Sequence, residues 1–142
     1  MYKKILIPLD NSPADNTILA HIRPFLKLTG AKIILVHVSD GFGARLQEEL
    51  NLEDSEEIKA DRNYLKQRET EFAREGFQVK AFLTGGEPSV EILKITKDEA
   101  CDLIAMATHG HRLPKDIILG SVADKIRHST DIPILMIRAP HK

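Results

Sequence analysis

The chain has 142 residues, 42% hydrophobic and 29% charged, which is typical of one folded domain with its own core. Its 20 basic and 21 acidic residues leave a net charge of −1, which argues against a dedicated nucleic-acid-binding protein with a basic face. A single cysteine excludes an internal disulfide, and no segment reaches the roughly 20 apolar residues of a membrane span, so we expect a cytoplasmic protein.

Five runs of apolar residues, each bounded by turn residues, predict β-strands. The second run, KIILVHV, is apolar at nearly every position, which is typical of a parallel strand covered on both faces. Pro133 stands near the start of the last run, where a missing N–H is tolerated. The predicted strands are Lys4–Ile7, Lys32–Val38, Gln78–Leu83, Leu103–Ala107 and Ile132–Ile137.

Helical patterns fill the four gaps between these strands. Ser12 and Pro13 are typical of a helix cap and a first helical residue, and Gly30 is typical of the end of that helix. The second predicted helix is highly charged and carries only a sparse apolar stripe. The predicted helices begin near Ser12, Ser55, Pro88 and Gly120, and residues 40–54 form the one expected linker.

Regular alternation of strands and helices predicts one doubly wound, three-layer α/β/α domain over residues 1–142, with a five-stranded parallel sheet. In such sheets a ligand binds beyond the carboxyl ends of the strands, where the winding direction reverses. The first strand is central in most five-stranded folds of this kind. The segments that follow the first and fourth strands are therefore expected to share the ligand crevice: Pro8, Leu9 and Asp10, and Thr108, His109 and Gly110.

A glycine-rich segment after the fourth strand suggests a phosphate site. Gly110 is followed by nine residues and then by Gly120 and Ser121, where the sequence predicts the start of the last helix. Glycines allow close approach of an anion to the backbone, and the N–H groups of a first helical turn have no partner within the helix. Arg112 and Lys115, between the glycines, can add charge-assisted contacts.

Five segments together resemble the universal stress protein family over essentially the full length. They are PLD after the first strand, LVHV in the second, G86-x-P88, ATHG-(nine residues)-GSV and the final PILMIR. ATP-binding members of that family carry G-x2-G-x9-G-[ST]. This chain has Gly110, Gly120 and Ser121 of that pattern, with Ala107 in place of the first glycine. The resemblance implies a Rossmann-like fold of the adenine-nucleotide α-hydrolase type.

The resemblance also implies ATP as ligand, with Mg²⁺ or Mn²⁺. The residues themselves indicate no dedicated metal site, because His109 and His111 lack a third ligand nearby, and no catalytic residue, because no general base stands beside the phosphate loop. Asp10 would contact the ribose or a metal-bound water, and the backbone of Val38 would meet the adenine. The residues expected to bind nucleotide are Pro8, Leu9, Asp10, Val38, Met106, Ala107, Thr108, His109, Gly110, Arg112, Gly120, Ser121 and Val122.

The last strand is apolar almost throughout, and we expect it at an edge of the sheet. An uncovered edge of this kind is a liability in a monomer, and a second copy is its simplest cover. The resemblance likewise implies a homodimer formed through this strand. The expected interface residues are Pro133, Ile134, Leu135, Met136 and Ile137.

Three other features have structural explanations beside functional ones. His37 lies in an apolar strand, which favours a hydrogen-bonded core histidine over a catalyst. Cys101 has no neighbour that would lower its pKa, so packing is the expected role. The Asp10-Asn11-Ser12 cluster is expected both to cap the first helix and to contact the ligand.

The leading hypothesis is an ATP-binding, dimeric regulatory module of the stress response, with neither a nucleic-acid nor a membrane partner. An alternative is a member of the same family that binds no nucleotide and acts through protein partners, which Ala107 and Pro114 favour. A further alternative is an enzyme that hydrolyses ATP slowly. The sequence identifies no protein partner.

Overall fold

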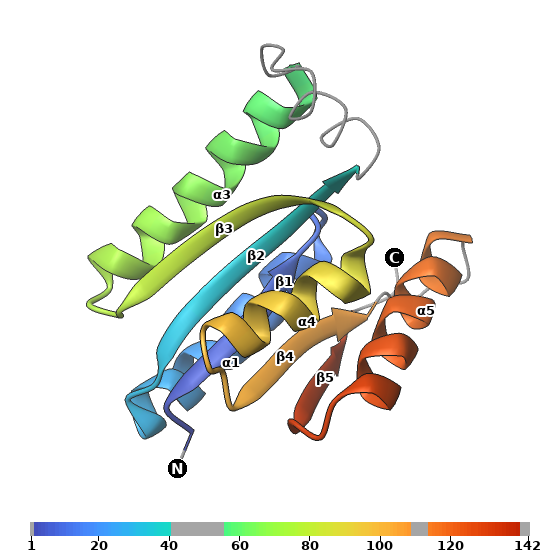
Figure 1. Ribbon diagram of the computed structural model, residues 1–142. Coiled ribbons are helices and arrows are strands. Elements are labelled where there is room, and N and C mark those ends of the chain that lie inside the picture. The colour runs from blue at the N-terminus through green and yellow to red at the C-terminus, as the bar shows by residue number, and fades with distance from the viewer. Residues whose placement is uncertain (1, 41–55, 109–113, 140–142) are drawn as a thin grey trace.

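The computed structural model describes residues 2–40, 56–108 and 114–139, of which residue 40 and residues 114–121 are described by their backbone alone. Strands and helices alternate along the chain, as predicted (Figure 1). The predicted linker 40–54 lies outside the described residues, apart from Asp40, which ends a strand. The elements are β1 (Lys4–Leu9), α1 (Ala14–Thr29), β2 (Lys32–Asp40), α3 (Glu56–Arg74), β3 (Val79–Gly86), α4 (Pro88–Asp98), β4 (Leu103–Thr108), α5 (Pro114–Ser129) and β5 (Ile134–Arg138).

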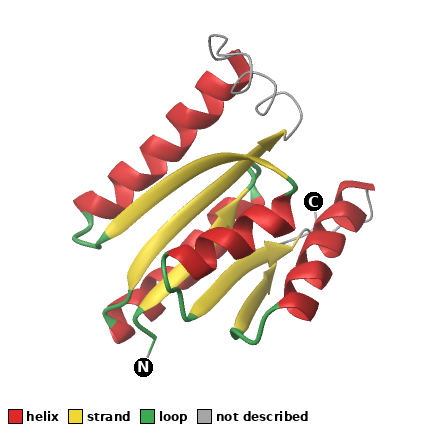
Figure 2. Ribbon diagram, viewed as in Figure 1, coloured by secondary structure: helices red, strands yellow, loops and turns green. Residues whose placement is uncertain are grey.

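The described strands form one five-stranded parallel sheet in the order β3-β2-β1-β4-β5. The predicted fold class is therefore confirmed, with β1 central and β5 at an edge. Helices cover both faces of the sheet, so the molecule has three layers (Figure 2). Within the described ranges, no helix combines the length and apolarity needed to cross a membrane.

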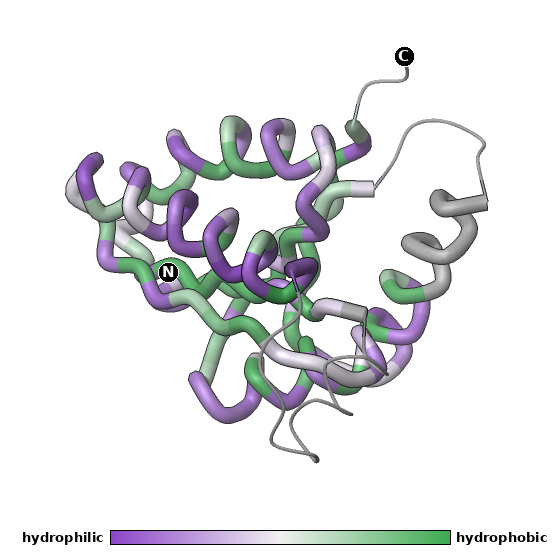
Figure 3. The backbone as a smooth tube through the Cα atoms, turned by 90° about the horizontal axis from the view of Figure 1, so that it is seen from above, coloured by the Kyte–Doolittle hydropathy of each residue, from purple (hydrophilic) through white to green (hydrophobic). Residues whose placement is uncertain are grey.

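Successive residues of each strand enter opposite halves of the core, because side chains alternate along a strand. Ile5 and Ile7 of β1 pack with α1 and α3, whereas Leu6 between them packs with α4 and α5. All three are fully buried. Consecutive buried hydrophobic residues therefore occur along β1, β2 and β4, at 5–7, 33–36 and 103–106. Along the helices, hydrophilic and hydrophobic residues alternate (Figure 3).

The prediction that the last helix begins near Gly120 is wrong. Helix α5 begins at Pro114, so Gly120 and Ser121 lie in its seventh and eighth positions. Proline suits the first position of a helix because its φ is already helical and its missing N–H is not needed there. Pro114 is therefore the helix-start signal, and it stands six residues before the start that the glycine pattern predicts.

Strand β1 is longer than predicted and continues through Pro8 to Leu9. Within the described residues, its pairing with β4 runs only from Ile5↔Leu103 to Leu6↔Ile104, whereas its pairing with β2 continues to Leu9↔His37. Proline has no N–H to donate to a sheet ladder. The ladder to β4 has therefore already ended where Pro8 stands, and the two strands diverge at their carboxyl ends.

Candidate functional site

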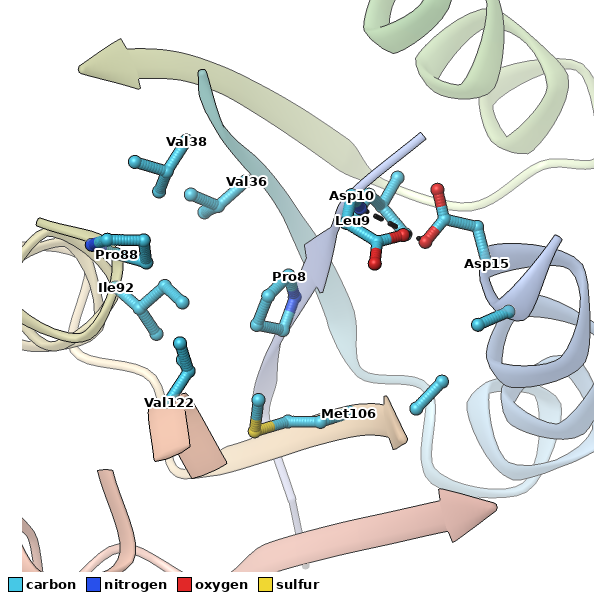
Figure 4. Close-up of a pocket in the computed structure, with 12 residues that line it drawn as sticks. Pro8, Leu9, Asp10, Asp15, Val36, Val38, Pro88, Ile92, Met106 and Val122 are labelled. Atoms are coloured by element: carbon cyan, nitrogen blue, oxygen red, sulfur yellow. Dashed lines mark hydrogen bonds between the residues drawn. The ribbon is translucent and has the colours of Figure 1, made fainter. Parts of the chain in front are cut away.

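A cavity of about 140 Å³ lies where β1 and β4 diverge, at the carboxyl ends of β1, β2 and β4. This is the crevice that the winding of the sheet predicts, because the chain passes to one side of β1 for β2 and β3 and to the other for β4 and β5. The lining residues are Pro8, Leu9, Asp10, Ala14, Asp15, Val36, Val38, Pro88, Ile92, Met106, Ala107 and Val122 (Figure 4).

The cavity is apolar along most of its wall and acidic at one end. Figure 4 shows the carboxylates of Asp10 and Asp15 together on one side, and Pro88, Ile92 and Val122 on the other. An apolar slot with few, localised polar groups is the usual composition of a small-molecule site. Such a slot suits a flat aromatic or heterocyclic group that carries hydroxyl groups at its acidic end.

Gly86 sets the position of the α4 wall of the cavity. Its φ of +129° lies in a region that side chains rarely adopt, and an added Cβ would stand 3.1 Å from Cγ of Glu91. The chain turns there from β3 into α4. Glu87 then caps the helix by accepting the N–H of Val90 at 3.0 Å, and Pro88 takes the first helical position, as predicted. The G-x-P motif thereby brings Pro88 to the cavity.

The turn between β1 and α1 brings Asp10 to the acidic end. Asp10 Oδ1 accepts the N–H of Ser12 at 3.1 Å, and Ser12 Oγ accepts the N–H of Ala14 at 3.3 Å. Asn11 has a φ of +59°, which asparagine tolerates better than most residues. The prediction of Ser12 as the cap and Pro13 as the first helical residue is wrong: α1 begins at Ala14, with Pro13 as its N-cap and no side-chain cap hydrogen bond. Asp10 lines the cavity beside this turn.

Asp15 is a charged residue of the site that the sequence did not predict. It is only 2% exposed, and it accepts the backbone N–H groups of Asp10 and Asn11 at 3.1 and 2.9 Å. Burial raises the pKa of Asp15 to about 6; the hydrogen bond from Tyr64 lowers this pKa and the charge of Asp10 raises it. An acidic residue in a first helical turn is ordinarily explained by the helix dipole. Its place on the buried stripe, three residues before Ile18, was the available signal.

Two residues that the sequence assigned to packing do pack. His37 is buried, with Nδ1 2.8 Å from the carbonyl oxygen of Leu9 and Nε2 3.2 Å from Oδ2 of Asp61. The prediction of a hydrogen-bonded core histidine is confirmed. Cys101 is buried as well, and burial raises the pKa of its thiol to about 11, so the thiol is not activated.

The cavity brings together seven of the residues predicted to bind nucleotide. Val36, Pro88 and Ile92 join them in the apolar wall without having been predicted as site residues. Val36 could have been found, because it stands two residues before Val38 and therefore on the same face of β2. The seven predicted residues are Pro8, Leu9, Asp10, Val38, Met106, Ala107 and Val122.

The other six residues predicted to bind nucleotide do not line the cavity in the described part of the chain. Thr108 ends β4, is half-buried, and its carbonyl accepts the N–H of Ala139 at 2.7 Å. The backbones of Gly120 and Ser121 lie beyond the first turn of α5, where N–H groups bond to carbonyls of the preceding turn. The structure therefore does not contain the predicted cradle of free N–H groups at these two residues. His109, Gly110 and Arg112 lie outside the described residues.

The predicted position of the last strand is confirmed, because β5 is an edge strand of the sheet. Met136 is 41% exposed there, and Pro133 is exposed just before the strand begins. Ile134, Leu135 and Ile137 are partly buried. An apolar edge of this kind is available for pairing with a further strand.

Comparison with known proteins identifies relatives over almost the whole chain. Residues 1–138 match the model of the universal stress protein family. Universal stress protein MJ0577 of Methanocaldococcus jannaschii is 32% identical, over 97% of this chain and 96% of that protein. YxiE, a universal stress protein of Bacillus subtilis, is 26% identical, over 97% of this chain and 100% of its own length.

Solved structures resemble the fold described above. MJ0577 aligns with a TM-score of 0.78 and 33% identity, covering 100% of this chain and 99% of that chain. A universal stress protein of Archaeoglobus fulgidus in complex with dAMP aligns with a TM-score of 0.69 at 19% identity, over 96% and 98% of the two chains. Another, in complex with cAMP, reaches 0.70 at 14% identity, over 98% of each chain. At these last two identities the likeness is one of fold.

Proposed function

The chain belongs to the universal stress protein family, and on this premise we propose that it binds ATP in the cavity at the carboxyl ends of β1, β2 and β4. The observation that carries the proposal is the combination of an apolar slot with the Asp10 carboxylate at one end. The purine packs between the walls formed by Val38 and Ile92, and Asp10 accepts a hydrogen bond from a ribose hydroxyl. The dAMP and cAMP complexes of two proteins with this fold support an adenine nucleotide as ligand.

In this proposal the triphosphate, with Mg²⁺ or Mn²⁺, extends toward Gly110, Arg112, Gly120 and Ser121. For the N–H groups of Gly120 and Ser121 to reach phosphate oxygens, residues 114–119 must leave the helical conformation, because those N–H groups otherwise belong to the α5 ladder. Nucleotide binding is then coupled to a shortening of α5. A ligand can drive such a change by as much as its affinities for the two conformations differ.

The Gly120→Ala variant tests this coupling. Alanine in a helix interior is more favourable than glycine by about 0.5–1 kcal/mol, so we expect the free protein to become more stable by up to that amount. The same free energy opposes shortening of α5, so ATP affinity should fall about two- to fivefold. Urea unfolding and calorimetric titration measure the two effects. A more stable variant with unchanged ATP affinity would mean that α5 stays helical when ATP is bound.

We propose that nucleotide-dependent changes in shape or partner choice, rather than catalysis, are the output of the protein, as a regulatory module in the stress response. The family member that binds no nucleotide is the second candidate. The helical placement of Gly120 and the alanine at position 107 favour it. The cytoplasmic location expected from the single cysteine stays a prediction.

Calorimetric titration with Mg-ATP separates the two candidates. Binding should release or absorb measurable heat, and ATP at 100 times its Kd should stabilise the protein by about 2.7 kcal/mol, seen as a rise in Tm. AMP is the control that tests whether the triphosphate contributes to binding, and GTP is the control that tests whether the adenine base does. Neither heat nor a Tm shift at millimolar ATP would favour the protein-interaction candidate. Release of phosphate over many turnovers would instead indicate a slow ATPase.

We further propose that two copies pair through the edge of β5. Within the sheet, the carbonyl of Pro133 accepts the N–H of Ile104, and the N–H of Ala139 donates to Thr108. Backbone groups alternate in direction along a strand, so the N–H of Met136 points away from β4. It is available to a strand of a second molecule.

The Met136→Pro variant should therefore be monomeric. Proline removes the outward N–H but leaves the β4 ladder intact, and edge strands tolerate it at such a position. Met136→Leu keeps both the N–H and an apolar side chain and serves as the matched control, which we expect to remain dimeric. Sedimentation equilibrium distinguishes the two masses. A dimeric Met136→Pro protein would place the dimer contact elsewhere.

A further inference from the structure

A buried carboxylate joins the cavity to helix α3. Asp15 Oδ1 accepts the N–H of Asp10, and Oδ2 accepts both the N–H of Asn11 and the hydroxyl of Tyr64, which lies 49 positions further along the chain on α3. Figure 4 shows the bond between Asp15 and Asp10 at the acidic end of the cavity. The same side chain thus binds two consecutive N–H groups of the β1–α1 turn and one hydroxyl of a helix that contributes no lining residue to the cavity.

Further contacts between α3 and this region surround the carboxylate. Arg68, one turn beyond Tyr64, lies with its guanidinium carbon 5.2 Å from the centre of the Tyr64 ring and donates to Oδ1 of Asn16. On β2, His37 bonds to the carbonyl of Leu9 and to Asp61 of α3. Within residues 2–40, 56–108 and 114–139, the titratable groups that act on Asp15 are Asp10 on its own turn and Tyr64 on α3. Arg68 contacts Tyr64, and the His37–Asp61 pair contacts Leu9, so these groups form the next layer of charge.

Ionised Asp15 lowers the stability of the fold. Its pKa is raised from 3.8 to about 6, chiefly by burial, so the native state holds a proton that the unfolded state releases between these two pH values. The free energy of unfolding is therefore not reduced by Asp15 below pH 3.8, where the side chain is protonated in both states. It falls as the pH rises from 3.8 through about 6. A neutral side chain would avoid the loss. A buried carboxylate in a cavity wall, with its pKa displaced by burial, is a candidate for a functional role.

Resting on the proposed function, we propose that Asp15 is a positioning residue for nucleotide binding: its carboxylate, oriented by Tyr64, holds the Asp10–Asn11 turn in the conformation that presents Asp10 to the ribose. Hydrogen bonds to a charged acceptor are about twice as strong as neutral ones. Protonation of Asp15 weakens its hold on both N–H groups of the turn. The ionised form thus lowers stability and raises affinity.

Two opposite pH dependences follow. The first concerns the ratio of two ATP affinities measured at the same pH, that of the wild type over that of Asp15→Asn. This ratio should fall as the pH decreases through about 6. The ratio cancels the titration of ATP itself. The stability of the wild type relative to Asp15→Asn should rise over the same decrease. At pH 7.5, Asp15→Asn should bind ATP about tenfold more weakly, because the two N–H groups bond to different oxygens of Asp15 and the amide replaces one of these oxygens with an NH2 donor.

Tyr64→Phe separates positioning from packing. It keeps the ring but removes the hydroxyl that favours ionised Asp15, so the midpoint of the affinity profile should move to higher pH. Tyr2→Phe makes the same chemical change on a residue that packs against Phe25, and should leave the profile unchanged. Calorimetric titrations between pH 5 and 8 measure all four proteins.

A measurement without nucleotide tests the positioning directly. In NMR spectra of the free protein, the amide protons of Asp10 and Asn11 should shift together with a midpoint near pH 6, at higher pH in Tyr64→Phe, and not at all in Asp15→Asn. Amides that do not titrate would overturn the inference, as would wild-type ATP affinity and pH profile in Asp15→Asn. If the wild type binds no ATP at any pH, the proposed function fails, and the amide shifts alone decide whether Asp15 positions the turn.

Discussion

Replacement of Val38 by tryptophan is expected to abolish ATP binding while the fold remains intact. Val38 lies on β2 just beyond the last residue that pairs with β1, and its half-buried side chain lines the cavity. A cavity of about 140 Å³ has no room for both an indole ring and a purine. Tryptophan is favourable in strands, and the cavity can accept its ring without displacing the core.

We expect ATP affinity to fall at least about 100-fold, which corresponds to about 2.8 kcal/mol. Val90→Trp is the matched control, because Val90 lies on the neighbouring helix α4 but is 58% exposed and outside the cavity wall. Calorimetric titration gives the affinities, and circular dichroism reports the fold. Undiminished binding by a folded Val38→Trp protein would show that the nucleotide, if bound, lies elsewhere.

Replacement of Phe72 by alanine is expected to have the largest effect on stability. Phe72 is fully buried on α3, its ring centre lies 5.8 Å from that of Phe77, and the guanidinium of Arg23 covers it at 4.4 Å. Helix α3 is highly charged and buries few apolar side chains, so a large share of its apolar anchoring comes from this ring. Arg23 also pairs with Glu75 at the end of the helix.

Removal of a buried phenylalanine ring costs about 3–5 kcal/mol, a large part of the roughly 5–15 kcal/mol that stabilises a typical domain. Urea unfolding should therefore show a much lower midpoint at an unchanged slope. Leu28→Ala is the control, because Leu28 is 85% exposed and should change stability by less than about 0.5 kcal/mol. A loss below about 1 kcal/mol in Phe72→Ala would mean that the polar contacts of Asp61 and Tyr64, rather than the ring, attach α3 to the sheet.

Much of the fold followed from local patterns. Runs such as KIILVHV need cover on both faces, and their alternation with helices leaves few possible topologies, so the central β1 and the edge strand β5 were predicted correctly. The location of the cavity followed from the same topology. Six of the seven predicted residues meet there because they directly follow strands, or belong to strands, that end at one edge of the sheet, and the seventh, Val122, comes from α5.

The start of α5 shows where local patterns were insufficient. Pro114 and Gly120 can each mark the beginning of a helix, and the spacing of the glycines favoured the second. The structure begins the helix at Pro114. A motif that describes a ligand-bound conformation does not determine the conformation of the free chain, since the binding free energy can stabilise a different one.

The amino-acid sequence by itself determined the family, the parallel sheet and the edge where a ligand would lie, because periodic burial and the order of elements are properties of neighbouring residues. Only the tertiary structure decided that Asp15 is buried and that its partner is Tyr64, and that His37 meets Asp61. A buried carboxylate has to be satisfied by whichever donors the packing of α3 brings within reach. Such partners lie tens of residues away, at distances along the chain that no periodic pattern encodes.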